Sequence, residues 1–256
     1  MKKSFIIYMV SFPLTLCALL VSCQQSAPAS TANEIAQEAI EAIAELDTYQ
    51  FNIDRIITIT NEEGQASYVW DIYGAVDEIE KEIHHTMQIR GKEASGYSVE
   101  YNHEEYMVGN WLYEKFDDDP WSKSQSEHYW HNRDYASQQL DLLTTLIPVE
   151  LIGIDTVDGV DCYKVQLQPD KVSLWSWITL QGWGQVLEGH QQELTGDIVS
   201  DYSIFQWITK DAYFLIKSVV DVAFKVNSDT IVYTETVLLH HLNEPVSIEL
   251  STEAEP

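Results

Sequence analysis

Histidine is the residue type here that could most readily bind a metal ion, and its spacing decides whether it can. His84-His85 and His240-His241 are adjacent pairs within predicted strands. Neighbouring strand residues point to opposite faces, so neither pair can chelate one ion by itself. His128 and His131 have helical spacing, but their segment has weak helical patterning and differs from the HExxH order. The sequence therefore predicts no metal site and no cofactor.

Catalytic chemistry has no recognisable motif in the chain. Asp117-Asp-Asp119 does not follow the alternating ligand spacing of a calcium loop. The sequence contains no Gly-x-Ser-x-Gly elbow, glycine-rich phosphate loop or Cys–His nucleophile setting. Paired carboxylates carry little information in a chain with 41 acidic and 14 basic residues. We expect a protein that is not an enzyme. The alternative is an extracytoplasmic hydrolase, which would need carboxylates or histidines facing into a cavity.

The formal net charge of −27 excludes two classes of partner. Nucleic acids and anionic lipid surfaces both require basic patches, which so acidic a chain does not offer. The same charge keeps a protein with 8 Trp, 14 Tyr and 7 Phe in solution. The acidic residues are scattered, which is typical of a solvated surface.

The first 23 residues have the pattern of a secretory signal. Lys2 and Lys3 give a basic start, and an apolar run follows over Phe5–Val21. The end of this segment, Leu20-Val-Ser-Cys23, resembles the lipobox of bacterial lipoproteins. That resemblance implies cleavage before Cys23 and a diacylglyceryl anchor on its thiol, whose two acyl chains, such as palmitate, hold the protein at a membrane. It predicts a lipoprotein outside the cytoplasm, anchored to the bacterial cell membrane by lipid.

The alternative for this segment is an uncleaved transmembrane helix. The apolar run of 17 residues, interrupted by Ser11 and Pro13, is short for a bilayer span. We therefore expect a signal peptide over residues 1–22, a flexible linker over 23–32, one domain over 33–250 and a disordered tail over 251–256. Cys162 would be the one unmodified cysteine, so no intramolecular disulfide is expected.

Hydrophobic periodicity predicts an α+β domain. Helices are expected over Glu34–Leu46, capped by Asn33, and after Asp134 up to Pro148. Period-two patterns predict strands in the regions 49–115, 149–167 and 202–250. Between Tyr49 and Lys115 we expect about six strands, with Tyr97–Tyr101 and Tyr106–Val108 separate. Asp158-Gly159 marks a tight hairpin, and a last strand is expected over Val246–Leu250.

The stretch Asp170–Leu187 contains Trp175, Trp177 and Trp183, more than one amphipathic stripe can bury. Leu174, Trp175 and Ile178 lie along one helical side, with Trp177 and Trp183 off it. The segment is either a helix packed on the sheet or a lid over an apolar cavity.

Two stretches, Thr156–Pro169 and Trp207–Ser218, are similar to strand pairs of the lipoprotein localisation factor superfamily, LolA and LolB, with the related LppX/LprG-type lipoproteins. The resemblance extends over the order of elements from Asn33 to Leu250. It implies a strongly curved antiparallel sheet of about 10–11 strands, an incomplete β-barrel covered by helices. It also implies an apolar cavity that receives a lipid or acyl chain. No arginine among Arg55, Arg90 and Arg133 can be matched to the lid arginine of the periplasmic carrier.

The apolar strand and helix residues that would line this cavity are the expected ligand-binding residues. They are Phe51, Ile53, Ile57, Trp70, Ile72, Met87, Ile89, Tyr97, Val99, Trp175, Ile178, Phe214, Ile216, Val220, Phe224 and Val237. Each methylene of a guest chain buried there would contribute about 0.8 kcal/mol. The alternative is a sensory or protein-interaction module whose interior is filled by its own side chains.

Overall fold

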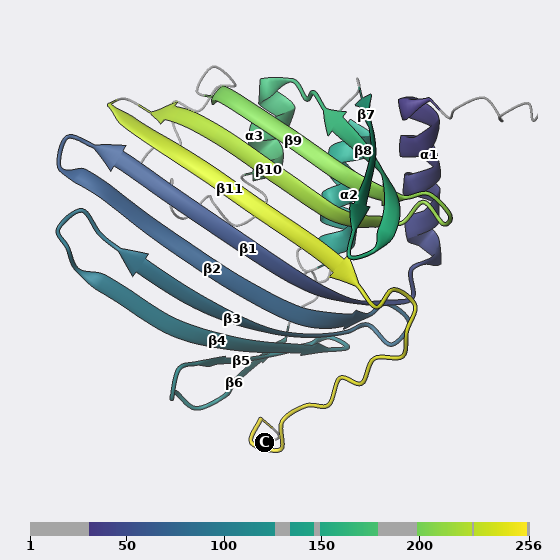
Figure 1. Ribbon diagram of the computed structural model, residues 1–256. Coiled ribbons are helices and arrows are strands. Elements are labelled where there is room, and N and C mark those ends of the chain that lie inside the picture. The colour runs from purple at the N-terminus through teal and green to yellow at the C-terminus, as the bar shows by residue number, and fades with distance from the viewer. Residues whose placement is uncertain (1–30, 126–133, 146–148, 179–198, 227, 255–256) are drawn as a thin grey trace, which may run out of the picture. The chain divides into compact units, whose positions relative to one another are not determined.

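The computed structural model describes residues 31–125, 134–145, 149–178, 199–226 and 228–254 (Figure 1). Its strands are β1 (Thr48–Asn61), β2 (Gly64–Asp77), β3 (Glu82–Lys92), β4 (Ser98–Val108), β5 (Trp111–Phe116), β6 (Ser122–Gln125), β7 (Val149–Val157), β8 (Val160–Leu167), β9 (Val199–Thr209), β10 (Leu215–Val226) and β11 (Asp229–His240). Its helices are α1 (Ala32–Ala42), the short 3-10 turn η1 (Ile43–Glu45), α2 (Tyr135–Thr145) and α3 (Lys171–Ile178).

All eleven strands form one curved antiparallel sheet, in the order β6-β5-β4-β3-β2-β1-β11-β10-β9-β8-β7. The edge strands β6 and β7 are not neighbours, so the sheet stays open and does not close into a barrel. Consecutive strands pair with each other except β6 and β7, which form the two edges and are separated in the chain by α2. Strands β8 and β9 pair although α3 lies between them in the chain, and β1 pairs with β11 at the centre of the sheet. The predicted α+β fold, with its incomplete barrel, is confirmed.

Helix α1 begins earlier than the sequence analysis placed it. Thr31, rather than Asn33, is the N-cap: Thr31 Oγ1 accepts from the Glu34 N–H, and the Glu34 carboxylate accepts from the Thr31 N–H. This reciprocal pair satisfies two amide donors that a helix start would otherwise leave open. The hydrogen bond from the Thr31 amide also lowers the pKa of Glu34. The helix therefore starts within the predicted linker.

Several strand boundaries differ from the predicted ones. Residues 97–101 and 106–108 do not belong to two strands, because β4 runs unbroken from Ser98 to Val108. The short β6 lies in a segment predicted to be irregular, and residues 246–250 do not form a strand. The hairpin at Asp158 and Gly159 is confirmed: both residues have positive φ, 49° and 85°, as a type I′ turn requires.

A β-bulge shifts the face on which β10 presents its first residues. Leu215 pairs with Ile208, whereas Lys217 pairs with the adjacent Trp207, so Ile216 is the extra residue. Ile216 consequently packs with Trp207 and Cys162 on one face, while Val220 belongs to the core on the other. A strict period of two predicted one shared face for Ile216 and Val220, and the bulge explains why that prediction is wrong for Ile216.

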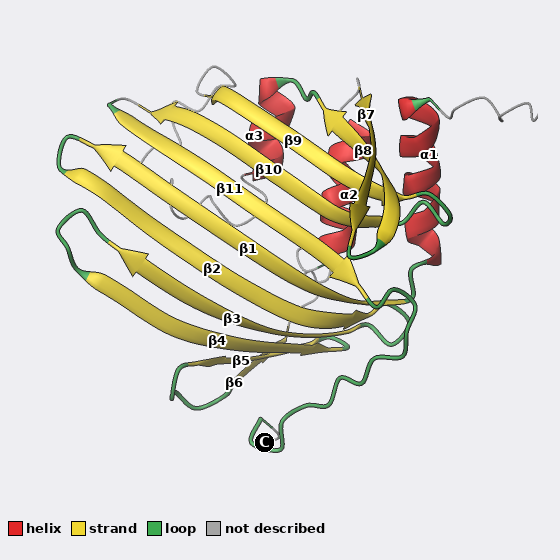
Figure 2. Cartoon of the chain, viewed as in Figure 1, coloured by secondary structure: helices red, strands yellow, loops and turns green. Residues whose placement is uncertain are grey.

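Helices α2 and α3 lie against one face of the sheet, which we call the inner face (Figure 2). Helix α1 packs against β7 and α2. The main core joins inner-face residues of β1 and β8–β11 to all three helices, and a second core lies around Phe51 and Tyr135. No helix in the described ranges is both long and apolar enough for a membrane crossing.

The outer face is covered only in part. Cys162, Trp207 and Ile216 form a small cluster there, and Leu238 and Leu242 pack against it. Cys162 is fully buried, as predicted, and burial raises the pKa of its thiol to about 11. At the other end of the sheet, the chain after β11 packs Ala254 against Tyr106 and Tyr113. Residues 251–254 thus form a turn of which Ala254 is buried, in the segment that was predicted to be a disordered tail.

Gly74 of β2 provides the space in which the second core assembles. A Cβ added at this position would lie 2.3 Å from the His84 carbonyl oxygen, 2.7 Å from His85 Cβ and 2.8 Å from Phe51 Cζ. We expect Gly74→Ala to lower the free energy of unfolding by about 1–3 kcal/mol or more, because backbone atoms must move to relieve the contact. Urea denaturation measures this. An unchanged midpoint would show that β2 and β3 are not packed this closely.

Candidate functional site

The inner face is the surface on which the predicted ligand-binding residues meet. Ten of those that lie on this face are at most 8% exposed: Phe51, Ile53, Ile57, Ile72, Ile89, Trp175, Ile178, Val220, Phe224 and Val237. They pack against one another and against the helices; the Trp175 and Phe224 rings, for example, meet edge to face at 5.4 Å. Side chains with 0–1% exposure contact neither solvent nor a void large enough for water. In this conformation α2 and α3 fill the space over these residues.

A second part of the inner face is more open. Trp70, Met87 and Val99, on β2, β3 and β4, are only half-buried. Cross-strand pairing places Tyr68 and Tyr101 beside them, and the latter is 37% exposed. We call these five residues the open strip. Trp70, Met87 and Val99 belong to the predicted lining and stay partly exposed among the residues that the structure describes, whereas Tyr68 and Tyr101 were not predicted.

Three predicted lining residues lie elsewhere. Tyr97 precedes β4 in a turn and is 63% exposed, so it does not line the inner face. Ile216 faces the outer cluster because of the bulge in β10. Phe214 lies just before β10 and packs between the second core and the outer cluster.

An ion pair lies at the centre of the inner face. Arg55 of β1 is directly opposite Glu235 of β11, and its Nε and Nη2 donate to Glu235 Oε2 at 2.8 and 2.6 Å. Burial is the largest single effect on Arg55 and lowers its pKa, but Glu235, Tyr233 and Tyr135 together outweigh it, so the pKa of the guanidinium is raised. Burial and then Glu235 also raise the pKa of Tyr233. The sequence analysis assigned no role to Arg55, because alternation along β1 does not reveal what faces it.

Helix α2 is attached to this ion pair and to α3 by polar contacts. Gln139 Nε2 donates to Glu235 Oε1 at 3.3 Å, and Gln206 Nε2 donates to the Gln139 carbonyl at 2.7 Å. Trp177 Nε1 donates to the Gln138 carbonyl at 3.0 Å and is buried, although the sequence analysis placed it off the packed side of α3. These contacts hold α2 and α3 together over the sheet.

Hydrogen bonds of Tyr49, a residue of β1, hold the first turn of α2 in place. Asp134 Oδ1 accepts from the Ser137 N–H at 3.0 Å, which confirms the predicted cap. Tyr49 donates its hydroxyl to the same oxygen at 3.2 Å and accepts from the Ala136 N–H at 3.4 Å. Burial, then the Asp134 charge, raise the pKa of Tyr49 well above its usual value, so the hydroxyl stays protonated. The position of α2 therefore depends on side chains of the sheet.

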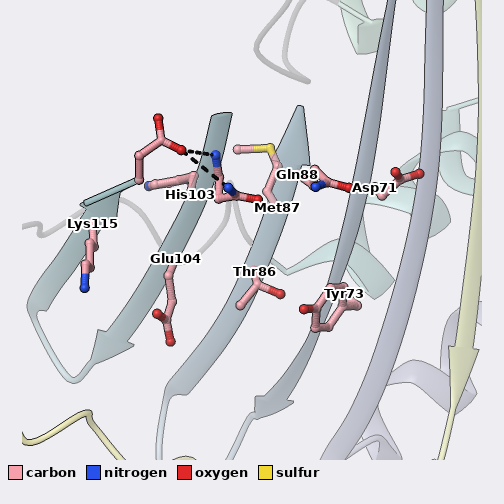
Figure 3. A pocket seen from close by; sticks show the side chains of 10 residues that line it. Asp71, Tyr73, Thr86, Met87, Gln88, His103, Glu104 and Lys115 are labelled. Carbon is pink, nitrogen blue, oxygen red and sulfur yellow. Dashed lines mark hydrogen bonds between the residues drawn. The ribbon is translucent and has the colours of Figure 1, made fainter. Parts of the chain in front are cut away.

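The outer face of β2–β5 carries a polar depression of about 360 Å³ (Figure 3). Tyr73, Thr86, Glu104 and Lys115 follow one another across it through cross-strand pairing. At its edge Asp117 accepts from the backbone and side-chain amides of Asn102 (Figure 3). Charges of both signs line this depression, which makes it unsuited to an apolar ligand.

Some predicted residues fall outside the described ranges. The lipidation site Cys23, the pair His128 and His131, and Trp183 are among them, as is Arg133. Their predicted roles remain predictions.

The chain has no match among family models or curated protein sequences. Its structure is similar to that of lipoprotein LppX from Mycobacterium tuberculosis, with TM-score 0.47 and 14% identity over 85% of this chain and 98% of that chain. LprF from Mycobacterium bovis gives TM-score 0.47 and 14% identity over 86% and 96% of the two chains. A putative outer membrane lipoprotein-sorting protein domain from Vibrio parahaemolyticus has a TM-score of 0.24 and 6% sequence identity, over 83% of this chain and 93% of that chain. These solved structures share 6–14% of their residues with this chain in the aligned regions. The likeness is one of fold.

Proposed function

We propose that this chain is a lipoprotein of the bacterial cell envelope, anchored through Cys23, that binds the acyl chain of a lipid or another apolar ligand at its inner face. The observation that carries the proposal is the open strip. Tyr68, Trp70, Met87, Val99 and Tyr101 are partly exposed apolar side chains on the inner face of three neighbouring strands of an open sheet. An acyl chain laid on this strip would bury its methylenes at about 0.8 kcal/mol each.

A longer guest would have to extend beneath the helices. The side chains there are closely packed, so such a guest would displace α2 and α3 from Trp175, Val220 and their neighbours. The polar contacts that would be broken among the described residues include the bonds of Gln139 to Glu235 and Gln206, those at Asp134, and the bond from Lys171 of α3 to the Val199 carbonyl. We infer that α2 and α3 act as one movable cover, and that ligand binding at the open strip precedes their displacement.

A sensory or protein-interaction module with a packed interior is the second candidate. The burial of ten predicted lining residues to 8% or less favours it. A hydrolase is disfavoured by access, because the side chains of the inward-facing His85, His103 and Glu105 are only 1–5% exposed.

Trp70→Glu, with Tyr73→Glu as the matched control, distinguishes the two candidates. Trp70 lies in the open strip, whereas Tyr73 is 58% exposed on the outer face of the same strand. We expect native mass spectrometry of the full-length protein to detect a bound lipid in the wild type and in Tyr73→Glu. The glutamate at position 70 places a charge where the acyl chain would lie, so occupancy should fall at least about tenfold.

Two results would contradict lipid binding at this surface. A wild-type protein that carries no non-covalent lipid, even after incubation with phospholipid vesicles, would favour the packed module. Equal loss of lipid in both variants would place the ligand elsewhere.

A further inference from the structure

Two histidines and a glutamate converge on the inner face near the start of α2. His85 of β3 is directly opposite Glu105 of β4, and His103 lies two residues before Glu105 on the same strand. All three side chains therefore project from the same face of the sheet. One donor atom from each lies within 4.8 Å of the other two.

A second carboxylate joins the group from the next strand. Glu114 of β5 is directly opposite Glu105, and its Oε1 lies 3.5 Å from His103 Nε2. Its side chain is 27% exposed, which gives an ion an access route from the β5 side. Three adjacent strands thus supply two imidazoles and two carboxylates.

The three inner members are enclosed, with exposures of 2% for His85, 5% for His103 and 1% for Glu105. Aromatic rings fix both imidazoles. Phe116 stacks on His103 with centroids 4.2 Å apart, and Tyr135 of α2 meets His85 edge-on at 6.4 Å. Because these rings restrict the imidazoles, the donor nitrogens keep their direction toward the carboxylates.

We propose that His85, His103, Glu105 and Glu114 bind one divalent transition-metal ion, and that zinc suits the site best. Imidazole nitrogen and carboxylate oxygen are both zinc ligands, at about 2.0–2.2 Å in tetrahedral geometry. The donor atoms of His85, His103 and Glu105 lie within 4.8 Å of one another, and the Glu114 carboxylate, 3.5 Å from His103 Nε2, would reach the same ion by side-chain rotation. With neutral imidazoles, the two carboxylates carry the charge that a divalent ion compensates. Four protein ligands close the coordination shell, which is typical of a structural site.

Such an ion would link β3, β4 and β5 through their side chains. It would lie beside Tyr135, the first residue of α2, whose ring contacts His85 and Phe51. The ordinary alternative is a set of histidine–carboxylate ion pairs without metal. Strands β3 and β4 also contain a histidine–glutamate pair outside the proposed metal site, which can serve as a control. His84 and Glu104 point to the outer face, with Nε2 and Oε1 3.2 Å apart, and both are about one-third exposed.

The test uses full-length, tag-free protein, purified in detergent and stripped with a chelator. Zinc is titrated into it, and bound metal is counted by mass spectrometry after buffer exchange. We expect one ion per chain and a higher melting temperature with zinc. His85→Gln and His103→Gln should each weaken binding by about 100-fold or more, since each removes a direct ligand. His84→Gln with Glu104→Gln should leave the affinity unchanged.

A Co²⁺-loaded wild-type protein provides a readout that does not depend on the folding of any variant. Ligand-field absorption of tetrahedral cobalt with nitrogen and oxygen ligands is expected. Less than stoichiometric zinc, no such absorption, or equal weakening by the outer-face control would each overturn the proposal.

Discussion

Replacing Arg55 with methionine is expected to lower the free energy of unfolding by about 3–5 kcal/mol, because it leaves the Glu235 carboxylate buried without its cation. Glu235 is 1% exposed and receives two hydrogen bonds from Arg55. Gln139 of α2 donates to its other oxygen, so the loss should also loosen α2. Urea denaturation measures the effect on stability, and hydrogen exchange of the α2 amides measures the local opening.

The control for this variant is Arg90→Met. Arg90 pairs with Asp71 on the outer face, where the side chains are 51% and 34% exposed, so its loss should cost about 1 kcal/mol or less. The double variant Arg55→Met with Glu235→Leu should recover most of the stability, since it replaces a buried pair with apolar groups of similar size. Equal effects of Arg55→Met and Arg90→Met would mean that the central pair is hydrated.

Replacing Phe51 with alanine is expected to lower the free energy of unfolding by about 3–5 kcal/mol. Phe51 is fully buried, its ring lies 4.6 Å from that of Tyr135, and it faces Gly74 across β1 and β2. The ring fills the space that Gly74 leaves, and Gly74 cannot close the cavity that truncation would create. The shift in the midpoint of urea denaturation measures this loss in the free energy of unfolding.

Tyr97→Ala serves as the comparison. Tyr97 was also a predicted lining residue, but it is 63% exposed in a turn, so its truncation should change stability by about 0.5 kcal/mol or less. A large loss in Tyr97→Ala would show that this turn is packed in solution. A small loss in Phe51→Ala would mean that the inner face contains a hollow beneath α2.

Local patterns in the sequence were sufficient for most of the sheet. Period-two alternation predicts β1–β3 and β9–β11, and the Asp158-Gly159 signal predicts the hairpin between β7 and β8. These succeed because strand alternation and turn geometry depend on residues close in the chain. The same reasoning failed at Ile216 and in the middle of β4. A bulge, or a polar run such as Asn102–Glu105 inside a strand, is stabilised by partners across the sheet.

Hydrophobic period and turn residues are local properties, and they were enough to predict antiparallel strands with an apolar face and the helices at either end of the first meander. The open sheet covered by helices was expected only from the resemblance to the lipoprotein localisation factor superfamily. Only the tertiary structure decided which residues meet. Arg55 and Glu235 are 180 positions apart, and His85, His103, Glu105 and Glu114 come from three strands. Their proximity depends on strand register, which the chain fixes only when all strands pair. The tertiary structure likewise decided that α2 and α3 fill most of the predicted lining, because their packing depends on shape.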